Sequence, residues 1–377
     1  MRGDNLKNSL PHTALFGAIF LLICDILGRV LIYPYEIPIG LMVGVIGSAI
    51  FLYLLLRRPK HAAKWIYLIF GTVSLGLILT FLFIGLTPTG WDYALPRRGR
   101  SVAAIVIVGA VIAFSTLIFQ TITNNRILTP SIIGLDSLYI LIQTTLVFVL
   151  GTVGLVAVSQ YVNFGISVVG MVLFALLLYA LLFKREQQNL YFLLLVGIVF
   201  GTLFSSMSTF MQVLIDPNEF LTIQNRMFAS FSNINVDLLW ISIVLIGLTI
   251  LYIWPYLKYL DAISLGRDQA INLGVPYDKA IRKFLIVIAI FVSISTALVG
   301  PILFLGLLVV NVAREIMPTY KHTHMAIAST LISIIALVGG TLLVERVFSY
   351  SAPLSVFINF IGGIYFIYLL LRGTKTT

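Results

Sequence analysis

The amino-acid sequence predicts an all-α polytopic membrane protein, with a ten-span bundle at 61–377 preceded by an extra two-helix transmembrane hairpin at about 10–57. Two observations carry this prediction. Hydrophobic residues make up 60% of the 377 residues and charged residues only 10%, whereas a soluble domain carries about 25% charged residues. The apolar residues also form runs long enough to cross a bilayer, which takes about 20 residues.

The apolar runs follow one another with short polar connections. Those long enough to span lie at 13–32, 37–56, 65–86, 101–122, 137–157, 162–183, 190–214, 236–256, 282–300, 324–344 and 354–372. The shorter run 303–317 predicts an abbreviated span. The first run lacks a small-residue cleavage site and continues into another span, so we expect no cleavable signal peptide.

Basic residues follow the positive-inside pattern, so the net charge of +10 does not indicate nucleic-acid binding. One orientation puts both termini and most basic clusters in the cytoplasm. Those clusters are Arg57/Arg58/Lys60/Lys64, Lys184/Arg185, Lys258–Lys283, Arg314/Lys321 and Arg372/Lys375. The exceptions on the outer side are Arg97, Arg98, Arg100, Arg226 and Arg346.

An internal repeat divides the chain. Residues 46–57 match residues 361–372, with Gly, Tyr and Arg at equivalent positions. A chance match of two apolar helix ends is the alternative, and the shared Gly, Tyr and Arg argue against it. We therefore predict an extra transmembrane hairpin at 1–60, followed by a complete unit at 61–377.

One sizeable polar island, 258–283, interrupts the apolar runs and holds eight of the 38 charged residues (24 basic and 14 acidic). The residues Ile263, Gly266, Ala270 and Leu273 recur within it at three- and four-residue steps, which predicts a small-apolar stripe on a short helix. Gly274 then predicts a helix stop, and Val275-Pro276 a restart toward a second short helix. Such a hairpin is suited to seat against another protein; a solvated loop is the plainer alternative.

If this membrane protein is a transporter, the energy for transport is expected to come from outside this chain. The sequence contains no Gly-x-x-x-x-Gly-Lys-Ser/Thr phosphate loop. Asp136, Asp237 and Glu345 fall where spans begin or end, which fits interfacial positions better than a proton relay. A partner acting at the polar island is the favoured source, and a self-sufficient secondary carrier or polytopic membrane enzyme is the alternative.

Histidine and cysteine give no catalytic, cofactor or metal site. The single Cys24 excludes an internal disulfide. His322 and His324 are two residues apart, which points them to different faces of a helix. No Ser-His-Asp, paired-carboxylate or Cys/His constellation stands out.

One predicted span carries a weakly polar face suited to a path for a bulky hydrophilic solute. Gly197 and Gly201, at a spacing that permits close helix contact, precede this face. The candidate path residues are Ser205, Ser208, Thr209 and Gln212.

Three segments resemble motifs of the ABC-importer permeases for ferric siderophores, haem and cobalamin. Asn-Arg-Ile-Leu-Thr-Pro-Ser-Ile-Ile-Gly at 125–134 resembles that family's Asn-Pro-Leu-Ala-x-Pro-x-x-Leu-Gly signature. Residues 265–275 resemble its cytoplasmic coupling hairpin. Gly-Pro-Ile-Leu-Phe-Leu-Gly-Leu at 300–307 resembles its Gly-Pro-Ile-x-Phe-Val-Gly-Leu element, closed by Ala313-Arg314.

Departures from the family pattern are also informative. Arg126 stands where the family usually has Pro, and Val310-Asn311 stands for the usual Pro-His. With Trp91-Asp92-Tyr93 and 120–126, these departures resemble the anguibactin- and petrobactin-type branch. The front hairpin, through 34–40, resembles the tail of the sister permease, which predicts a fused or merged reading frame.

The resemblance implies a ten-span type II ABC importer permease that moves a ferric siderophore across the bacterial cytoplasmic membrane by alternating access. It implies a sister permease, an ABC ATPase dimer that hydrolyses the ATP, an external substrate-binding protein and no cofactor. Haem or cobalamin is the alternative substrate.

The resemblance also implies two contact sites. The ATPase-coupling residues would be Asp261, Leu265, Gly266, Arg267, Ala270, Leu273 and Gly274. Leu95-Pro96-Arg97 resembles the family's Arg-Leu-Pro-Arg element at the outer mouth, with Ala94 in place of the first Arg. The binding-protein docking residues would be Arg97, Arg98 and Arg346. The alternative is that these guanidinium groups reach lipid headgroups.

Overall fold

The computed structural model describes residues 21, 23, 26, 62–84, 91–183, 190–231, 234–348 and 353–373. The chain divides into two compact units, Met1–Ala62 and Ala63–Thr377. The predicted spans 13–32 and 37–56, and the first copy of the repeat, lie almost entirely outside the described residues. The second unit is therefore described by itself.

Every regular element in the described part of the chain is helical, which confirms the all-α prediction. The α-helices are α3 (Ala62–Phe83), α4 (Trp91–Ile122), α5 (Leu135–Ala157), α6 (Gln160–Phe183), α7 (Leu190–Leu214), α8 (Pro217–Met227), α9 (Val236–Ile253), α10 (Leu260–Ile263), α11 (Arg267–Asn272), α12 (Tyr277–Val299), α13 (Leu305–Ile316), α14 (His322–Arg346) and α15 (Leu354–Gly373). Two short 3-10 helices, η2 (Pro130–Ile133) and η3 (Trp254–Tyr259), lie between them.

Eight of these helices are long and apolar enough to cross a membrane. α5 has a shorter apolar part, Leu135–Gly151, and a non-helical Gly151 interrupts it. α13 has 12 residues, as expected for an abbreviated span. The membrane-protein prediction is thus confirmed, and the count of ten complete crossings stays a prediction.

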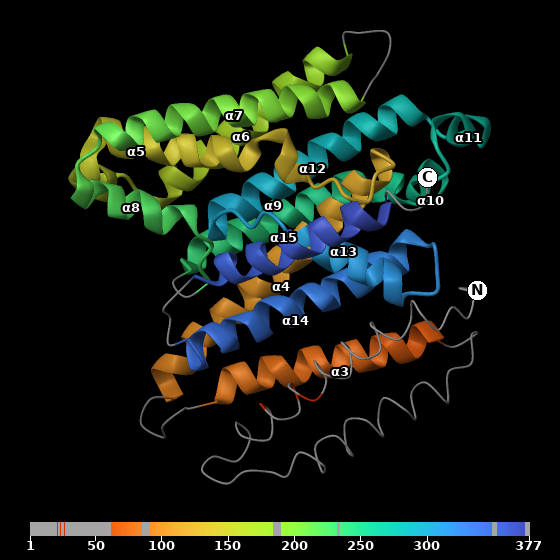
Figure 1. Ribbon diagram of the computed structural model, residues 1–377, viewed down its shortest axis with the longest axis horizontal. Coiled ribbons are helices and arrows are strands. Elements are labelled where there is room, and N and C mark those ends of the chain that lie inside the picture. The colour runs from red at the N-terminus through yellow and green to blue at the C-terminus, as the bar shows by residue number, and fades with distance from the viewer. Residues whose placement is uncertain are drawn as a thin grey trace. The chain divides into compact units, whose positions relative to one another are not determined.

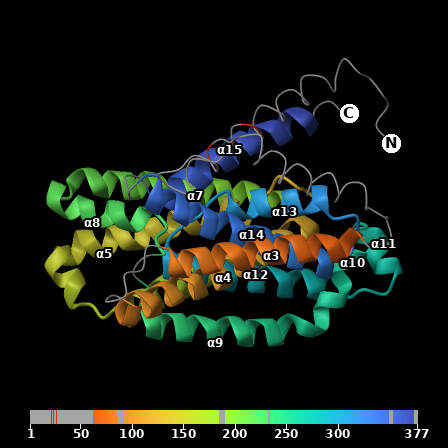
Figure 2. The same cartoon turned by 90° about the horizontal axis from the view of Figure 1, so that it is seen from below.

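The long helices run roughly alongside one another, and the short elements lie at the ends (Figures 1 and 2). In both views α8 lies at one end of the bundle and α10 with α11 at the other. We call these the α8 end and the hairpin end.

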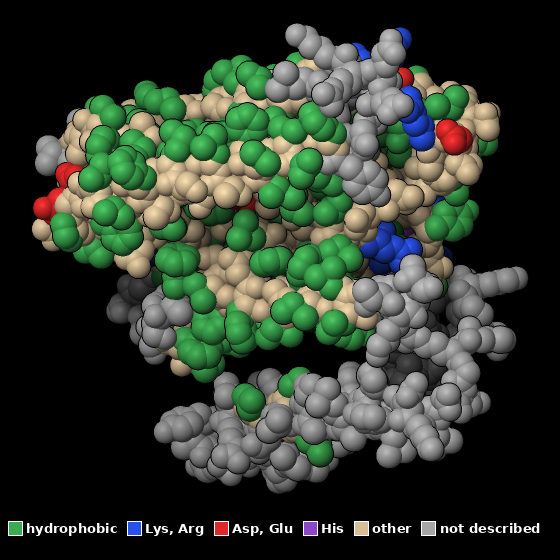
Figure 3. Space-filling view, turned by 45° about the horizontal axis from the view of Figure 1, so that its top comes forward, with side chains coloured by type: hydrophobic (Ala, Val, Ile, Leu, Met, Phe, Trp, Pro, Cys, Tyr) green, Lys and Arg blue, Asp and Glu red, His purple; other side chains and the backbone are tan. Residues whose placement is uncertain are grey.

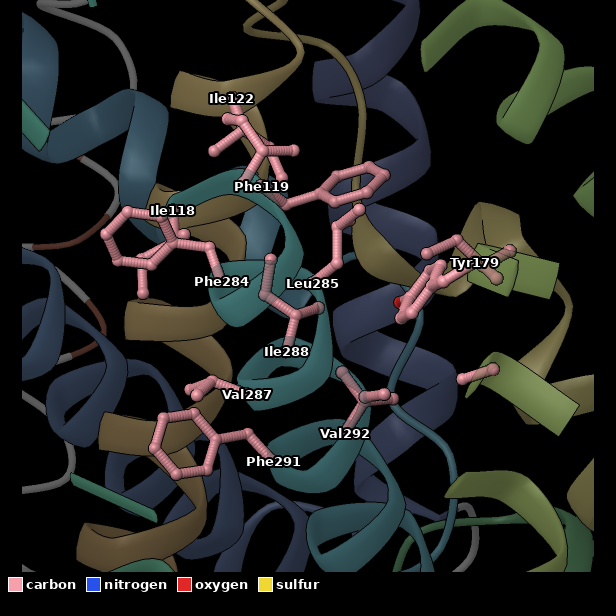
Figure 4. Close-up of a cluster of buried hydrophobic side chains, with 14 of the residues drawn as sticks. Ile118, Phe119, Ile122, Tyr179, Phe284, Leu285, Val287, Ile288, Phe291 and Val292 are labelled. Atoms are coloured by element: carbon pink, nitrogen blue, oxygen red, sulfur yellow. The ribbon is translucent and has the colours of Figure 1, made fainter. Parts of the chain in front are cut away.

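The core is built around α12 and α4. In their most apolar segments 67% and 61% of the residues are buried, against 17% in α3. Figure 4 shows Phe284, Leu285, Ile288 and other residues of α12 packed beside Ile118 and Phe119 of α4. The exposed faces of the outer helices are left for lipid or for partner subunits.

Outside the polar island and the helix that follows it, two elements differ from the sequence prediction. α4 begins at Trp91, ten residues before the predicted start at 101, and continues through Pro96. Arg97, Arg98 and Arg100 interrupt the apolar run from which the span was predicted, but Arg98 is bound by the protein itself, as described below. α8 was not predicted, although Asp216 accepts a hydrogen bond from the Asn218 N–H and Pro217 follows at the first helical position, which is a recognisable helix start.

Candidate functional site

The polar island folds as a hairpin of short pieces at one end of the bundle. The chain leaves η3, forms α10, turns at Gly266, forms α11 and turns again at Gly274. Both glycines have positive φ, +102° and +81°, a conformation that other residues rarely adopt. The predicted stop at Gly274 is confirmed. Val275-Pro276, however, leads directly into the 23-residue α12 rather than into a second short helix.

The expected stripe of small apolar residues is wrong. Ile263 and Ala270 are 2% and 0% exposed and pack into the main core. Gly266 breaks the helix between them, so the helical period on which the stripe depended does not continue. The exposed apolar side chains of the hairpin are instead Leu265, Ile271 and Leu273, at 58%, 47% and 63% exposed.

Asp261 fastens the hairpin to the bundle. Its Oδ1 atom accepts a hydrogen bond from the His322 backbone N–H (2.9 Å) and lies 2.6 Å from His322 Nδ1. The other ring nitrogen of His322, Nε2, lies 2.8 Å from Thr121 Oγ1. Asp261 is thereby linked to the first turn of α14 and to the last turn of α4. No signal in the sequence predicts these contacts of His322, which was considered only with His324 as a metal pair and set aside.

Arg267 stabilises the turn between α11 and α12. Its guanidinium lies 3.6 Å from Asp278 Oδ1 and 5.8 Å from the centre of the Tyr277 ring. Both contacts stay within the hairpin and the first turn of α12. The hairpin is therefore a preformed element with an exposed apolar tip.

Two of the predicted docking arginines bind the last turn of α3. Arg98 donates to the carbonyl oxygens of Phe81, Leu82 and Ile84, at 3.1, 3.2 and 2.7 Å. Arg346 also donates to the Ile84 carbonyl (2.9 Å). These carbonyls have no partner within their own helix, so the guanidinium groups replace the missing N–H donors.

Arg97 lies elsewhere. Together with Arg100, Asp92, Gln160 and Asn235 it lines a cavity of about 450 Å³ near the N-terminal end of α4. This places one predicted docking residue in a hollow with amide, acidic and basic groups, and the other two in contacts with the end of α3.

The predicted path residues on α7 separate into two sets. Gln212 Nε2 donates to Ser208 Oγ (2.9 Å), and Ser208 Oγ lies 2.8 Å from Thr144 Oγ1 of α5, so these two residues face the bundle. Ser205 and Thr209 are exposed. The exposed hydroxyl-bearing residues of α7 recur at helical spacing and form one stripe, Thr202, Ser205, Ser206 and Thr209.

Gly197 and Gly201 bring α7 against the backbone of η2. A Cβ atom at Gly197 would lie 2.8 Å from Ile133 Cα, and one at Gly201 would lie 3.2 Å from Gly134 Cα. Gly134 itself has φ +87°. α7 thus packs on the end of the signature segment as well as on α5.

Asp136, which the sequence places where a span begins, lies in the first turn of α5 and is buried against the rest of the bundle. It is 5% exposed, and its Oδ1 accepts a hydrogen bond from Thr296 Oγ1 of α12 (3.0 Å). A hydrogen-bonded carboxyl in this position ties α5 to α12.

Within the described residues, no group of three or more His, Cys, Asp or Glu side chains is arranged to hold a metal ion. His322 contacts Asp261 and Thr121, whereas His324 Nδ1 lies 2.6 Å from the Tyr67 hydroxyl. The two histidines therefore serve different contacts on different sides of α14.

Comparisons with known proteins agree with this architecture. The model of the FecCD transport family matches residues 1–57 and 62–372. The petrobactin import system permease protein YclO of Bacillus subtilis (strain 168) is 60% identical over 304 residues, covering 81% of this chain and 96% of that protein. The petrobactin import system permease protein YclN of the same strain is 72% identical over 61 residues, which cover 16% of this chain and 19% of that protein.

A solved structure shares the fold. It is described as an inward-facing conformation of a metal-chelate type ABC transporter. It superposes with a TM-score of 0.70 at 20% identity and covers 82% of this chain and 99% of that one.

Proposed function

Because this chain belongs to the FecCD transport family, we propose that it is the permease subunit of an ATP-binding-cassette importer that carries a ferric siderophore of the petrobactin class. The observation that carries the proposal is the 60% identity to YclO along nearly the whole of that permease. The subunit is not an enzyme: it moves the chelate without changing it, and alternating access is the whole mechanism. A secondary carrier is the less favoured function, since one hydrogen-bonded Asp136 does not make a proton relay.

The ATPase dimer would dock on the hairpin. The exposed Leu265, Ile271 and Leu273 offer it an apolar contact, and buried apolar anchors give most of the energy of such interfaces. When the ATPases move the hairpin, Asp261 at its base would transmit that movement to His322. The other residues proposed for coupling, Gly266, Arg267, Ala270 and Gly274, hold the hairpin in shape.

The hairpin end would then face the cytoplasm, with both chain termini on that side. The distribution of charge supports this orientation. Figure 3 shows the described Lys and Arg side chains of one face gathered at the right-hand end, where α10 and α11 lie, beside a mainly hydrophobic middle. Cytoplasmic segments of membrane proteins carry such an excess of basic residues.

A sister permease would pack against the exposed face of α7. The stripe of Thr202, Ser205, Ser206 and Thr209 would line a path between the two subunits, while Ser208 and Gln212 hold α7 on α5. Hydroxyl groups in that position interact with a hydrophilic chelate without binding it tightly.

The substrate-binding protein would dock at the α8 end. We assign the contact first to Arg97, because it lines the cavity near the start of α4. Arg98 and Arg346 would contribute their positive charge while holding the end of α3 in place.

Residues 1–60 would be a remnant of the sister permease. Two findings support this: the family model matches 1–57 and 62–372 as separate pieces, and a 61-residue stretch of the chain is 72% identical to YclN. Residues 61–377 would then form the complete permease domain.

Reconstitution tests the proposed function directly. The chain is placed in proteoliposomes with its sister permease and ATPase, and the uptake of radiolabelled ferric petrobactin is followed with the loaded binding protein outside. We expect ATP-dependent accumulation that unlabelled ferric petrobactin competes away and that haem or cobalamin does not. Accumulation of haem or cobalamin in preference to the siderophore would contradict the proposed substrate, and accumulation without ATP would contradict the transporter class.

A further inference from the structure

A basic cavity lies beside the coupling hairpin. It has a volume of about 510 Å³ and is bounded by the last turn of α4, the end of α13 and the start of α14. Two guanidinium groups line it, those of Arg126 and Arg314. Among the described residues of its lining none is acidic, and Asn124, Ser264 and Thr319 add neutral polar groups.

The loop that carries Arg126 is held by two buried amides. The Arg126 carbonyl accepts hydrogen bonds from Gln120 Nε2 (2.8 Å) and Asn311 Nδ2 (2.9 Å). Asn311 also donates to the Leu307 carbonyl within its own helix (2.9 Å). Gln120 and Asn311 are 1% and 4% exposed, so the loop rests on fixed supports.

These contacts join two departures from the family pattern. Arg126 stands in place of Pro and Asn311 in place of His, 185 residues apart in the chain. In the folded protein Asn311 supports the loop from which Arg126 reaches the cavity. The two replacements therefore act on one site.

The charges of this cavity favour an anion. Arg126 and Arg314 line the same hollow, and Arg314 is half-buried on α13. Two like charges that line one cavity repel each other, and an anion bound between them removes that repulsion. Guanidinium groups match the geometry of phosphate oxygens with paired hydrogen bonds. His322 is not available to a ligand, because both of its ring nitrogens already have partners.

We propose that this cavity binds a phosphate-class anion, supplied either by the headgroup of an anionic phospholipid or by free inorganic phosphate. Ser264, in the turn after α10, lines the same cavity, and Asp261 is bonded to His322 at its edge. A bound anion therefore neutralises the arginine pair next to the attachment of the hairpin. Anion binding does not depend on the proposed transport function, so an experiment that contradicts one proposal leaves the other standing.

The test measures binding to the full-length purified chain. Inorganic phosphate is titrated at constant ionic strength in lipid-depleted detergent, and the thermal unfolding midpoint is recorded. In parallel, the midpoint is compared between nanodiscs of phosphatidylcholine alone and nanodiscs containing phosphatidylglycerol. A rise with phosphate identifies the free anion, and a rise only with phosphatidylglycerol identifies the lipid headgroup.

Matched variants localise the effect. Arg126→Gln should raise the half-saturating ligand concentration at least about tenfold, as expected for lost hydrogen bonds to a charged group. Lys64→Gln removes the same charge from the first turn of α3, outside the cavity lining, and should behave like the unmodified chain. Arg314→Gln should raise the half-saturating concentration as Arg126→Gln does. If Arg314→Gln does not fold, the Arg126→Gln variant still tests the proposal, because Arg126 is exposed. No response to either ligand, or equal responses in Arg126→Gln and Lys64→Gln, would overturn the proposal.

Discussion

Single charged residues in this bundle bind the backbone as well as other charges. Arg98 satisfies three carbonyl groups at the end of α3, and its guanidinium also lies 3.6 Å from Glu345. In a bilayer an unsatisfied carbonyl is costly, since no water replaces its partner. This explains why α4 extends ten residues beyond its apolar part: its charged first turns complete the end of a neighbouring helix.

The docking of the binding protein is tested at Arg97. The Arg97→Glu change should weaken binding of the loaded protein to the assembled importer, and more strongly at low than at moderate salt, because exposed charge pairs are screened. Lys64→Glu makes the same charge change on α3 and should have little effect. Equal affinity of Arg97→Glu and the unmodified importer at both salt concentrations would favour a headgroup contact instead.

The buried carboxyl gives a prediction for stability. Thr296→Val removes the donor to Asp136 Oδ1 and should lower the free energy of unfolding by about 1–3 kcal/mol. Thr249→Val is the matched control, because the Thr249 hydroxyl donates only to the Leu245 carbonyl of its own helix. Thermal unfolding of the two variants in the same detergent makes the comparison. An equal loss of stability in Thr296→Val and Thr249→Val would show that the hydrogen bond to Asp136 makes no specific contribution to stability.

At the scale of elements, the packing of α7 on η2 depends on the absence of side chains. Gly197→Leu should separate the two by adding atoms where only 2.8 Å is free, at a cost of about 1–3 kcal/mol in stability and with loss of uptake. Gly247→Leu on α9 serves as control, since a Cβ there meets nothing within 4 Å. Normal stability of Gly197→Leu would contradict this packing.

The hairpin carries a second prediction at this scale. Leu273→Asp should reduce chelate-stimulated ATPase activity at least about tenfold while leaving the unfolding midpoint unchanged, because Leu273 is exposed and its loss affects a partner contact. Asn272→Asp adds the same charge without removing an apolar contact and should retain activity. Ala270→Trp should instead lower the midpoint, because Ala270 is fully buried. An Ala270→Trp variant with an unchanged unfolding midpoint but without chelate-stimulated ATPase activity would show instead that Ala270 contacts the ATPase, as the family resemblance implies.

Hydropathy and helix signals predicted most of the elements. The spans from α5 to α15 lie within a few residues of their predicted ranges, because length and apolarity alone decide them. The interior of the hairpin was not predictable, since Gly266 interrupts the helical period. The contacts of Asp261 with His322 and of Asp136 with Thr296 join residues 61 and 160 positions apart, and neither pair leaves a pattern in one sequence.

At the scale of the whole molecule, the question is whether the front unit takes part in transport. Two spans added in front, as the sequence predicts, would leave the orientation of every later span unchanged, so such a fusion would be tolerated. A chain that starts near Lys60 should therefore support full siderophore uptake with its native partners. Uptake is measured at matched expression of the truncated and full-length chains. Loss of uptake by a well-expressed truncated chain would show that the front unit belongs to the working transporter, for example by replacing the last hairpin of the sister permease.

The joined helices α4 and α14 have a mechanical consequence. Thr121 contacts His322 near one end of the pair, and Arg98 lies 3.6 Å from Glu345 near the other. Helices joined at both ends resist sliding and rotation against each other, so we expect them to move as one rigid unit of about 38 Å, the length of 25 helical residues. A tilt of the hairpin would then displace the far ends of both helices as a rigid body. By the same linkage, we expect a protein docked there to bias the hairpin before any nucleotide is hydrolysed.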